Sequence, residues 1–433
     1  MSYQELLSKR AEKIAGKNDI NPETLLNSNP KRKAISRKSC NFSQKRILPL
    51  MILTLLCMII STLALNPNKS RQLESFSSYI TLTIEKTGTQ TFLGSNFKLC
   101  PDEVYVNEAK IEENCVKSTL LTAPNSQIKV VFQKEINSTE NMFYRAFNIK
   151  YIDLSHFNTA LVTNMKNMFS FCYELTSINF ANIDTSSVTT MESMFQKCLS
   201  LTSINIRGFD TSKVVTMQSM FHSCKRLKKL DFSKFNTSSV TIMEAMFYNS
   251  SVIESLDLSS FDTSKVTTMK DMFYDGGYTF LDLSNFDTSN VQTMSGLFSS
   301  CTKLKSVDIS SFNTTQVTSM SSMFSSCSAL TSVDITHFNT SQVTSMASMF
   351  SGCSVLKSIN VSFFNTSKVN NMGYMFSGCS TFTKIDVSNF DTSSVTSLAY
   401  MFNNCKKLNP IDVSNFNTKS VTTLANMFKE CDA

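Results

Sequence analysis

The stretch DISSFNTTQVTSMSSMFSSC, from Asp308 to Cys327, contains the pattern that decides the fold of this chain. The pattern recurs along the sequence, and the Phe of its Met-Phe or Leu-Phe pair stands at positions 143, 169, 195, 221, 247, 273, 298, 324, 350, 376, 402 and 428. Ten of the eleven intervals are 26 residues long, and one is 25. A fixed period in this range is typical of a solenoid, whose units bury their apolar faces against one another.

Each repeat has two halves with different spacings of apolar residues. In 304–312, apolar and polar residues alternate, which predicts a strand with one buried face. In 317–327, Val, Met, Met-Phe and Cys recur at spacings that place them on one side of a short helix. Asn313 and Thr314 precede this helix and supply cap or turn chemistry. The sequence therefore predicts an α/β repeat solenoid, a leucine-rich-repeat horseshoe with a parallel β-sheet.

The repeat wording FNTSxVTxMxxMFxxCxxLxxIDxSxF resembles the BspA-type leucine-rich-repeat surface proteins of bacteria and microbial eukaryotes. The resemblance covers residues 143–433 and, more loosely, 79–142. It implies a curved parallel β-solenoid at a cell surface, used in adhesion or recognition, and it brings no activity, cofactor or catalytic residue. The long basic leader departs from the bacterial members, which usually carry a signal or lipoprotein sequence.

Residues 47–65 read ILPLMILTLLCMIISTLAL and contain no charged residue. A helix of this length spans about 28 Å, close to the hydrocarbon thickness of a bilayer, so we expect a single transmembrane helix. Seven basic and no acidic residues in 31–46 place the N-terminus in the cytosol and predict a single-pass type II protein. A cleaved secretory signal, with its cleavage site at 62–64, is the alternative.

The predicted domain organisation follows from the anchor and the repeats. A basic, largely disordered cytosolic tail (1–46) precedes the transmembrane helix (47–65) and a linker (66–78). A β-rich cap (79–142) and a solenoid of about 11 coils (143–433) complete the chain.

Composition and charge count against several classes of function. The tail holds 11 Lys/Arg and four acidic residues, so it accounts for the whole net charge of +7 and leaves the rest neutral. A neutral body disfavours nucleic acid as a partner. Three His, ten Gly and no Trp count against a His-rich metal site, a Gly-rich nucleotide loop and a Trp-built pocket.

The cysteines outside the first 65 residues fall into two groups. Cys100 and Cys115 precede the repeats and, on the predicted topology, face an oxidising compartment, which makes them a candidate disulfide. The others stand three residues after a repeat Phe, and we expect them to be buried free thiols that act as small hydrophobes. They are Cys172, Cys198, Cys224, Cys301, Cys327, Cys353, Cys379, Cys405 and Cys431.

A column of Asp and Asn side chains is predicted on the concave side of the horseshoe. One interpretation is a solvated face whose side chains bridge neighbouring strands by hydrogen bonds. The other is a carboxylate ladder that gathers Ca²⁺ or cationic ligands, formed by Asp231, Asp257, Asp282, Asp308 and Asp334. No other metal site, no cofactor and no catalytic residue is predicted.

The two central repeats break the pattern, because Ser250 and Gly276 replace the column cysteine and the second repeat is one residue short. Aromatic residues gather there, and Arg207 is an isolated arginine on the predicted strand face. Tyr and Arg are favoured at protein interfaces. The candidate partner contact is therefore Tyr248, Tyr274, Tyr278, Phe280 and Arg207, with a tolerated degenerate repeat as the alternative.

Eight sequons are candidate glycosylation sites in a surface glycoprotein. They are Asn68, Asn137, Asn236, Asn249, Asn313, Asn339, Asn360 and Asn365.

Adhesion or recognition of an extracellular protein or glycan is the predicted function, at a plasma membrane or, alternatively, in a secretory lumen. Catalysis is not expected, because His156 and His337 would lie more than about 30 Å apart at 4.8 Å per coil. The last repeat has no polar cover, which suggests self-association through this coil. The alternative function is a structural surface coat that packs laterally without a specific ligand.

Overall fold

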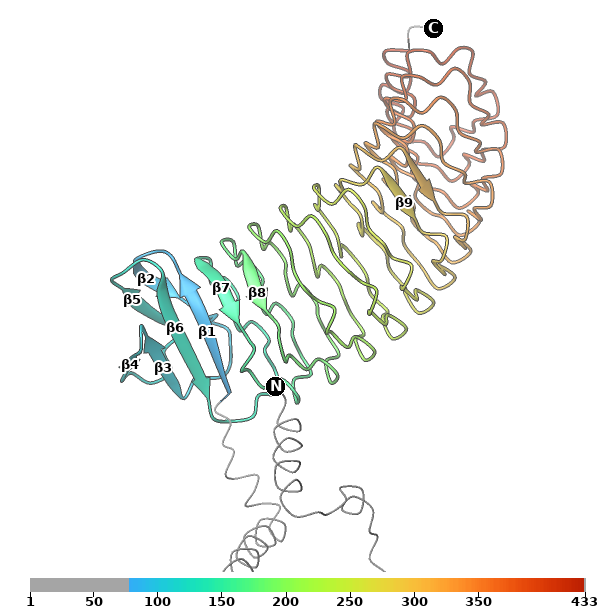
Figure 1. Ribbon diagram of the computed structural model, residues 1–433. Helices are drawn as coiled ribbons and strands as arrows, with labels where there is room; N and C mark the ends of the chain where they lie inside the picture. Colours follow the sequence, from blue (N-terminus) through green and yellow to red (C-terminus); the bar gives the residue numbers. More distant parts are fainter. Residues whose placement is uncertain (1–77, 432–433) are drawn as a thin grey trace, which may run out of the picture. The chain divides into compact units, whose positions relative to one another are not determined.

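The computed structural model describes residues 78–431, and its longest strands lie at the N-terminal end of the repeats (Figure 1). Six strands precede the repeats: β1 (Ser78–Ile84), β2 (Gly88–Thr91), β3 (Glu103–Val106), β4 (Ala109–Ile111), β5 (Ser118–Leu121) and β6 (Ser126–Phe132). The described repeats contain β7 (Ile149–Asp153), β8 (Ser177–Asn179), β9 (Phe280–Asp282) and β10 (Ser306–Asp308).

The sheet ahead of the repeats continues into the first coils. In β1, the buried side chains of Ile80, Leu82 and Ile84 alternate with half-buried ones, as in a strand with one face on the core. β1 pairs antiparallel with both β6 and β7, and β7 pairs parallel with β8. The sheet order is β4-β3-β6-β1-β7-β8, while β2 and β5 form a separate antiparallel pair. The cap residues and the first two coils therefore share one sheet.

Successive coils stack through the second half of each repeat, which we call the ladder segment (320–327 in the representative unit). Eleven parallel bridges link positions one repeat apart, from Ser138–Asn164 to Ser397–Thr423. In the ladder segment, the N–H groups of Met320, Ser322, Phe324 and Ser326 donate to carbonyl groups of the next coil over 2.6–3.1 Å. The N–H groups of Met323, Ser325 and Cys327 donate to the carbonyl three residues earlier in their own coil.

The ladder segment is not the short helix that the sequence predicts, and residues 78–431 contain no helix. Ser322 and Ser326 have φ values of 58° and 59°, so a left-handed residue recurs every four residues and stops helical continuation. A helix would use its N–H groups within one coil, whereas here alternate N–H groups hold the next coil. The predicted α/β horseshoe is therefore wrong: the described repeats are stacked coils of turns.

The parallel sheet predicted along the whole solenoid is also shorter than expected. Between neighbouring described coils, strands pair only at β7–β8 and at β9–β10. The corresponding residues of the other coils lack regular strand pairing. Stacking in those coils depends on the ladder segment instead.

The predicted transmembrane helix (47–65), the cytosolic tail and the linker to residue 77 lie outside the described residues. Within 78–431, no helix has the length and apolar character that a bilayer-spanning segment needs. The predictions of a single-pass membrane protein, of the membrane as a partner and of a plasma-membrane location therefore find no support in the structure, and we withdraw them.

Columns of apolar side chains run through the stacked coils as one core. The Phe rings of the ladder segments stack from Phe143 to Phe428 with centroids 5.3–6.1 Å apart. Val and Met columns flank them and are almost fully buried. In the last described coil, Leu424 and Phe428 are 47% and 41% exposed, and self-association through this coil stays a prediction.

A buried threonine fastens each coil to the next at the turn before the ladder segment. The hydroxyl of Thr237 donates to the Asp262 carbonyl oxygen at 2.8 Å and accepts from the Asp262 N–H group at 2.8 Å. Thr211, Thr288 and Thr392 hold the next coil in the same two-bond arrangement. The Thr of the NTS and DTS motifs therefore has a structural role, because it joins neighbouring coils.

Replacing Thr237 with Val is expected to lower the free energy of unfolding by about 1–3 kcal/mol, because the buried side chain loses both hydrogen bonds to the backbone of Asp262. Thr237→Ser retains the hydroxyl and should cost about 1 kcal/mol or less. Urea unfolding followed by circular dichroism measures both. Equal stability of the Val and Ser variants would show that the hydroxyl does not hold the coils together.

Candidate functional site

Seven partly exposed rings come from residues one, two or four positions after the ladder Phe, in coils whose ladder Phe lies between 143 and 273. We call this set the aromatic strip: Tyr144, Phe147, Phe171, Tyr173, His222, Tyr248 and Tyr274. The ladder Phe points into the core and the following residue does not, so the local turn geometry sends these rings outward. Phe147 is 40% exposed, and the other six are half-buried.

The N-terminal part of the strip combines rings with cations. The rings of Tyr144 and Phe171 meet edge to face at 5.6 Å, and those of Phe147 and Tyr173 stack at 5.0 Å. The Arg145 guanidinium lies 5.2 Å from the Tyr144 centroid and 5.6 Å from that of Phe171. The Lys197 ammonium lies 4.7 Å from the Phe171 centroid. These distances are in the range of cation–π attraction.

The C-terminal part of the strip is a stack of three rings. His222 and Tyr248 are parallel at 4.5 Å, and Tyr248 and Tyr274 are parallel at 4.3 Å. Lys197 joins this stack to the N-terminal part, because its N–H group donates to the His222 carbonyl oxygen at 2.7 Å. The inner ring faces cover one another, so a ligand can reach only ring edges, hydroxyl groups and the outer faces.

Partial burial shifts the titration of this stack toward uncharged forms. Burial lowers the pKa of His222, and the Lys197 charge lowers it further. Burial also raises the pKa of Tyr248, with a contribution from Tyr274. The carboxyl groups of Asp271 and Asp275 have raised pKa values for the same reason, although Lys225 opposes the shift at Asp275. His222 Nδ1 is buried and has no hydrogen-bond partner among the described residues.

Later coils show that stacking does not require the strip. At the positions of Tyr248 and Tyr274 they carry Ser299, Ser325, Ser351 and Ser377. Their ladder Phe rings nevertheless stack at 5.3–5.9 Å, as in the earlier coils. The rings of the strip are therefore free for a role other than holding coils together.

The five residues predicted from the sequence to form a partner contact lie in different environments in the structure. It brings together Tyr248 and Tyr274 in the strip. Tyr278 is fully buried and packs against Phe273, so this residue is not available to a partner and the prediction is corrected for it. Phe280 lies in β9 and is 51% exposed. Arg207 forms an ion pair with Asp231 at 2.6 Å.

The carboxylates of the predicted Ca²⁺ ladder are used in local turns. Oδ1 of Asp282 accepts hydrogen bonds from the Ser284 N–H group at 3.0 Å and from its hydroxyl at 2.7 Å, and the Asp231, Asp308 and Asp334 turns are alike. In the Asp257 turn, Ser259 N–H donates at 3.0 Å. Hydrogen bonds from the Ser284 side chain and backbone hold the pKa of Asp282 below its ordinary value. Within 78–431, no group of three or more His, Cys, Asp or Glu is placed to hold a metal ion.

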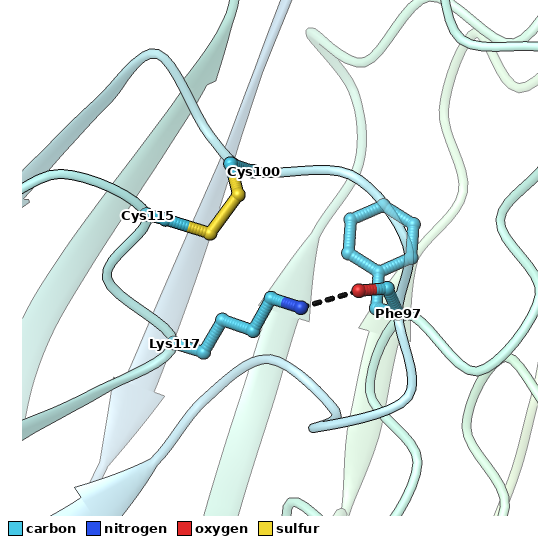
Figure 2. Close-up of a disulfide and its surroundings, with 4 residues drawn as sticks. All are labelled: Phe97, Cys100, Cys115 and Lys117. Atoms are coloured by element: carbon cyan, nitrogen blue, oxygen red, sulfur yellow. Dashed lines mark hydrogen bonds between the residues drawn. A yellow bond between two sulfur atoms is a disulfide. The ribbon is translucent and has the colours of Figure 1, made fainter.

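Cys100 and Cys115 are joined in a disulfide with a Cα–Cα distance of 4.6 Å (Figure 2). The bond closes the loop between β2 and β5 that also contains β3 and β4. Beside it, the Lys117 ammonium donates to the Phe97 carbonyl oxygen. This pair is distant in sequence from the aromatic strip and stabilises the cap.

The repeat cysteines are free, and each thiol donates to the carbonyl of the ladder Phe one coil earlier. Cys327 Sγ lies 3.0 Å from the Phe298 oxygen, and the other described coils with Cys repeat this contact. Ser250 makes the equivalent bond to Phe221 at 3.4 Å. All are buried except Cys431, which is half-buried.

Most predicted glycosylation asparagines lie in exposed turns. Asn137, Asn236, Asn313, Asn339, Asn360 and Asn365 are exposed, Asn249 is half-buried, and Asn68 lies outside the described residues. In the Asn313 turn, Oδ1 accepts from the N–H group of Thr315 at 3.1 Å, and Asn236, Asn339, Asn360 and Asn365 form similar turns.

Sequence reasoning identified only Tyr248 and Tyr274 of the strip. It missed Tyr144, Phe147, Phe171, Tyr173 and His222, together with Arg145 and Lys197. Aligning the repeats on the ladder Phe would have shown the signal: aromatic and basic residues are frequent after it up to 274, whereas the coils from 298 to 380 mostly carry Ser or Gly there.

Comparison with family models gives four consecutive matches to a family described as "Mycoplasma protein of unknown function, DUF285". The matches cover 117–204, 200–280, 277–358 and 355–433, and so include the whole aromatic strip. No curated protein matches the chain.

Proposed function

This chain belongs to the DUF285 family of tandem repeats, and we propose that it is a recognition protein that binds a macromolecular ligand along its aromatic strip without catalysis. The observation that carries the proposal is the contrast between coils. Later coils carry Ser at the repeat positions of Tyr248 and Tyr274, and their ladder Phe rings stack in the same way. The fold therefore does not require the aromatic residues of the strip.

The chemistry of the strip supports binding. Tyr side chains offer large contact area with few rotatable bonds, Arg adds a planar cation, and both residue types are favoured at recognition surfaces. The resemblance of the repeats to BspA-type surface proteins supports the same proposal, as a family in which repeats serve adhesion or recognition. The buried repeat thiols offer no reactive nucleophile, because burial raises the pKa of residues such as Cys224 and Cys301 to about 12.

The test uses a strip variant and a matched control. The strip variant Tyr173→Ser, Tyr248→Ser, Tyr274→Ser introduces serine at three strip positions. The coil with ladder Phe324 carries serine at the equivalent positions, as Ser325 and Ser328. The control Tyr374→Ser, Tyr400→Ser removes a second stacked pair, with centroids 4.6 Å apart, from a column that holds Ser322 and Ser348 in other coils.

The full-length proteins are compared on one array of immobilised polysaccharides and proteins. We expect at least one ligand whose affinity falls about tenfold or more in the strip variant and is unchanged in the control. Thermal unfolding of both variants verifies that the coils remain folded. If every ligand is retained equally by wild type and strip variant, the strip is not a binding surface. Ordered lateral self-association without any ligand would favour a coat protein.

A further inference from the structure

The shape of the strip restricts the ligand that it can bind. It extends over six coils, or about 24 Å at 4.8 Å per coil step, but is only one to three side chains wide. A stable interface with a globular protein buries about 800 Å² on each partner. Six of the seven rings are half-buried, so the strip presents a narrow row of ring edges rather than a broad apolar surface. An extended polymer fits the strip better than a globular surface.

The hydrogen bonding and ring stacking of the strip disfavour two common ways of binding polymers. Alternate N–H groups of its ladder segments, such as those of Phe169, Phe171 and Lys197, already donate to the next coil. A peptide strand therefore finds no free edge to extend. Single-stranded nucleic acid usually stacks its bases on open ring faces, but the inner faces of His222, Tyr248 and Tyr274 cover one another at 4.3–4.5 Å.

Four cationic side chains accompany the strip. Arg145, Lys225 and Arg226 are exposed, and Lys197 is half-buried. None of these four is among the ion pairs formed by the described residues. By contrast, Lys166 and Lys270 nearby are each paired with a glutamate. The acidic side chains beside the strip are Glu174, which pairs with Lys86, and Asp271 and Asp275 at its C-terminal end, where Asp275 also faces Lys225. Positive charge is therefore available over the N-terminal and central coils.

We propose that the ligand of the aromatic strip is an anionic polysaccharide, whose sulfate or carboxylate groups meet Arg145, Lys197 and Lys225 while its hydroxyl groups meet the tyrosine edges. This inference rests on the proposed binding function and specifies its ligand class. Cations bind the charged groups, and side-chain hydroxyls exchange hydrogen bonds with the sugar rings. The affinity falls with ionic strength because the cations are at the surface.

The experiment measures binding of heparin oligosaccharides to the full-length chain by calorimetry. The charge variant Arg145→Ser, Lys197→Ser, Lys225→Ser introduces serine. Other coils carry serine at the equivalent repeat positions, as Ser223, Ser251 and Ser300. The control Lys303→Ser, Lys305→Ser, Lys357→Ser removes the same number of exposed charges outside the strip. We expect the charge variant to bind about 30-fold more weakly and the control to change by less than about threefold.

Several results would overturn the ligand class. Equal weakening by the control would show that heparin is held by overall charge rather than by the strip. Strip-dependent binding of single-stranded DNA or poly-glutamate with the affinity of heparin would assign another polymer. If heparin does not bind but the array yields a neutral or protein ligand that depends on Tyr248 and Tyr274, the inference fails and the proposed function stands. If no ligand depends on the strip, both fail.

Discussion

The repeat region is expected to lose stability steeply between about pH 9 and pH 12, as its buried thiols become able to ionise in the unfolded chain. Eight free cysteines are buried in the core. Burial raises the pKa of Cys224, Cys301, Cys353 and Cys405 to about 12, and the remaining buried thiols shift in the same direction. An unfolded cysteine ionises near pH 8.5.

The sign follows from proton linkage. A raised pKa in the folded state gives a stabilisation that is complete below the unfolded pKa and is lost as the pH rises toward the folded pKa. Each thiol lowers the free energy of unfolding by about 1.4 kcal/mol per pH unit in this window. All eight together lower it by about 11 kcal/mol per pH unit if the coils unfold as one.

Urea unfolding at a series of pH values measures this slope. Replacement of Cys301, Cys327, Cys353 and Cys379 by Ser provides the control, because Ser250 occupies the same column and keeps the hydrogen bond to the preceding coil. We expect the slope to fall by about half in this variant. A free energy of unfolding that does not change between pH 9 and 11 would contradict burial of the thiols.

The second large effect is expected at the short central repeat, where Gly276 and Tyr278 depend on each other. A Cβ atom at Gly276 would overlap the Tyr278 ring and lie 3.0 Å from the Phe273 carbonyl oxygen. The tyrosine therefore fills the space that a column cysteine occupies in other coils. Gly276→Ala is expected to destabilise the protein by about 2–4 kcal/mol through overpacking.

Tyr278→Leu introduces the residue that other coils carry in this column and opens space next to Gly276. The stability lost by the double variant Gly276→Ala, Tyr278→Leu should therefore be about 2 kcal/mol smaller than the sum of the losses in the two single variants. Urea unfolding of the four proteins measures this coupling. Gly208→Ala, where a Cβ atom has no neighbour within 4 Å, is the control for a glycine replacement. Additive losses would show that the ring does not fill the cysteine position.

The repeat period and the buried columns could be predicted from sequence because every coil contains the same apolar residues at the same spacing. The local structure of the ladder segment could not be predicted from that spacing. Residues at Val317, Met320, Phe324 and similar offsets share one side of a helix, but they also share one side of a chain of turns. The residues with positive φ recur every four positions, as at Ser322 and Ser326, but Phe171 and Tyr374 also occupy such positions, so residue type alone does not mark the turns.

The aromatic strip was less predictable because its residues lie outside the buried pattern. Tyr278 was assigned to the surface since its neighbours Tyr248 and Tyr274 are there. The missing residue of this repeat moves Tyr278 into the column of buried Leu residues, which only the packing shows. Phe171 and Lys197 come together across coils through left-handed residues with φ of 64° and 57°, and their contact depends on that turn geometry.

The central claim, that the aromatic strip is where ligand binds, is tested most directly by hydroxyl-radical footprinting with and without saturating heparin oligosaccharide. Protection is predicted at Phe147, Tyr173, Tyr248 and Tyr274, with no change at Phe363 and Tyr374, which are 59% and 44% exposed away from the strip. Protection of Phe363 or Tyr374 while the strip remains as reactive as in the free protein would contradict the account.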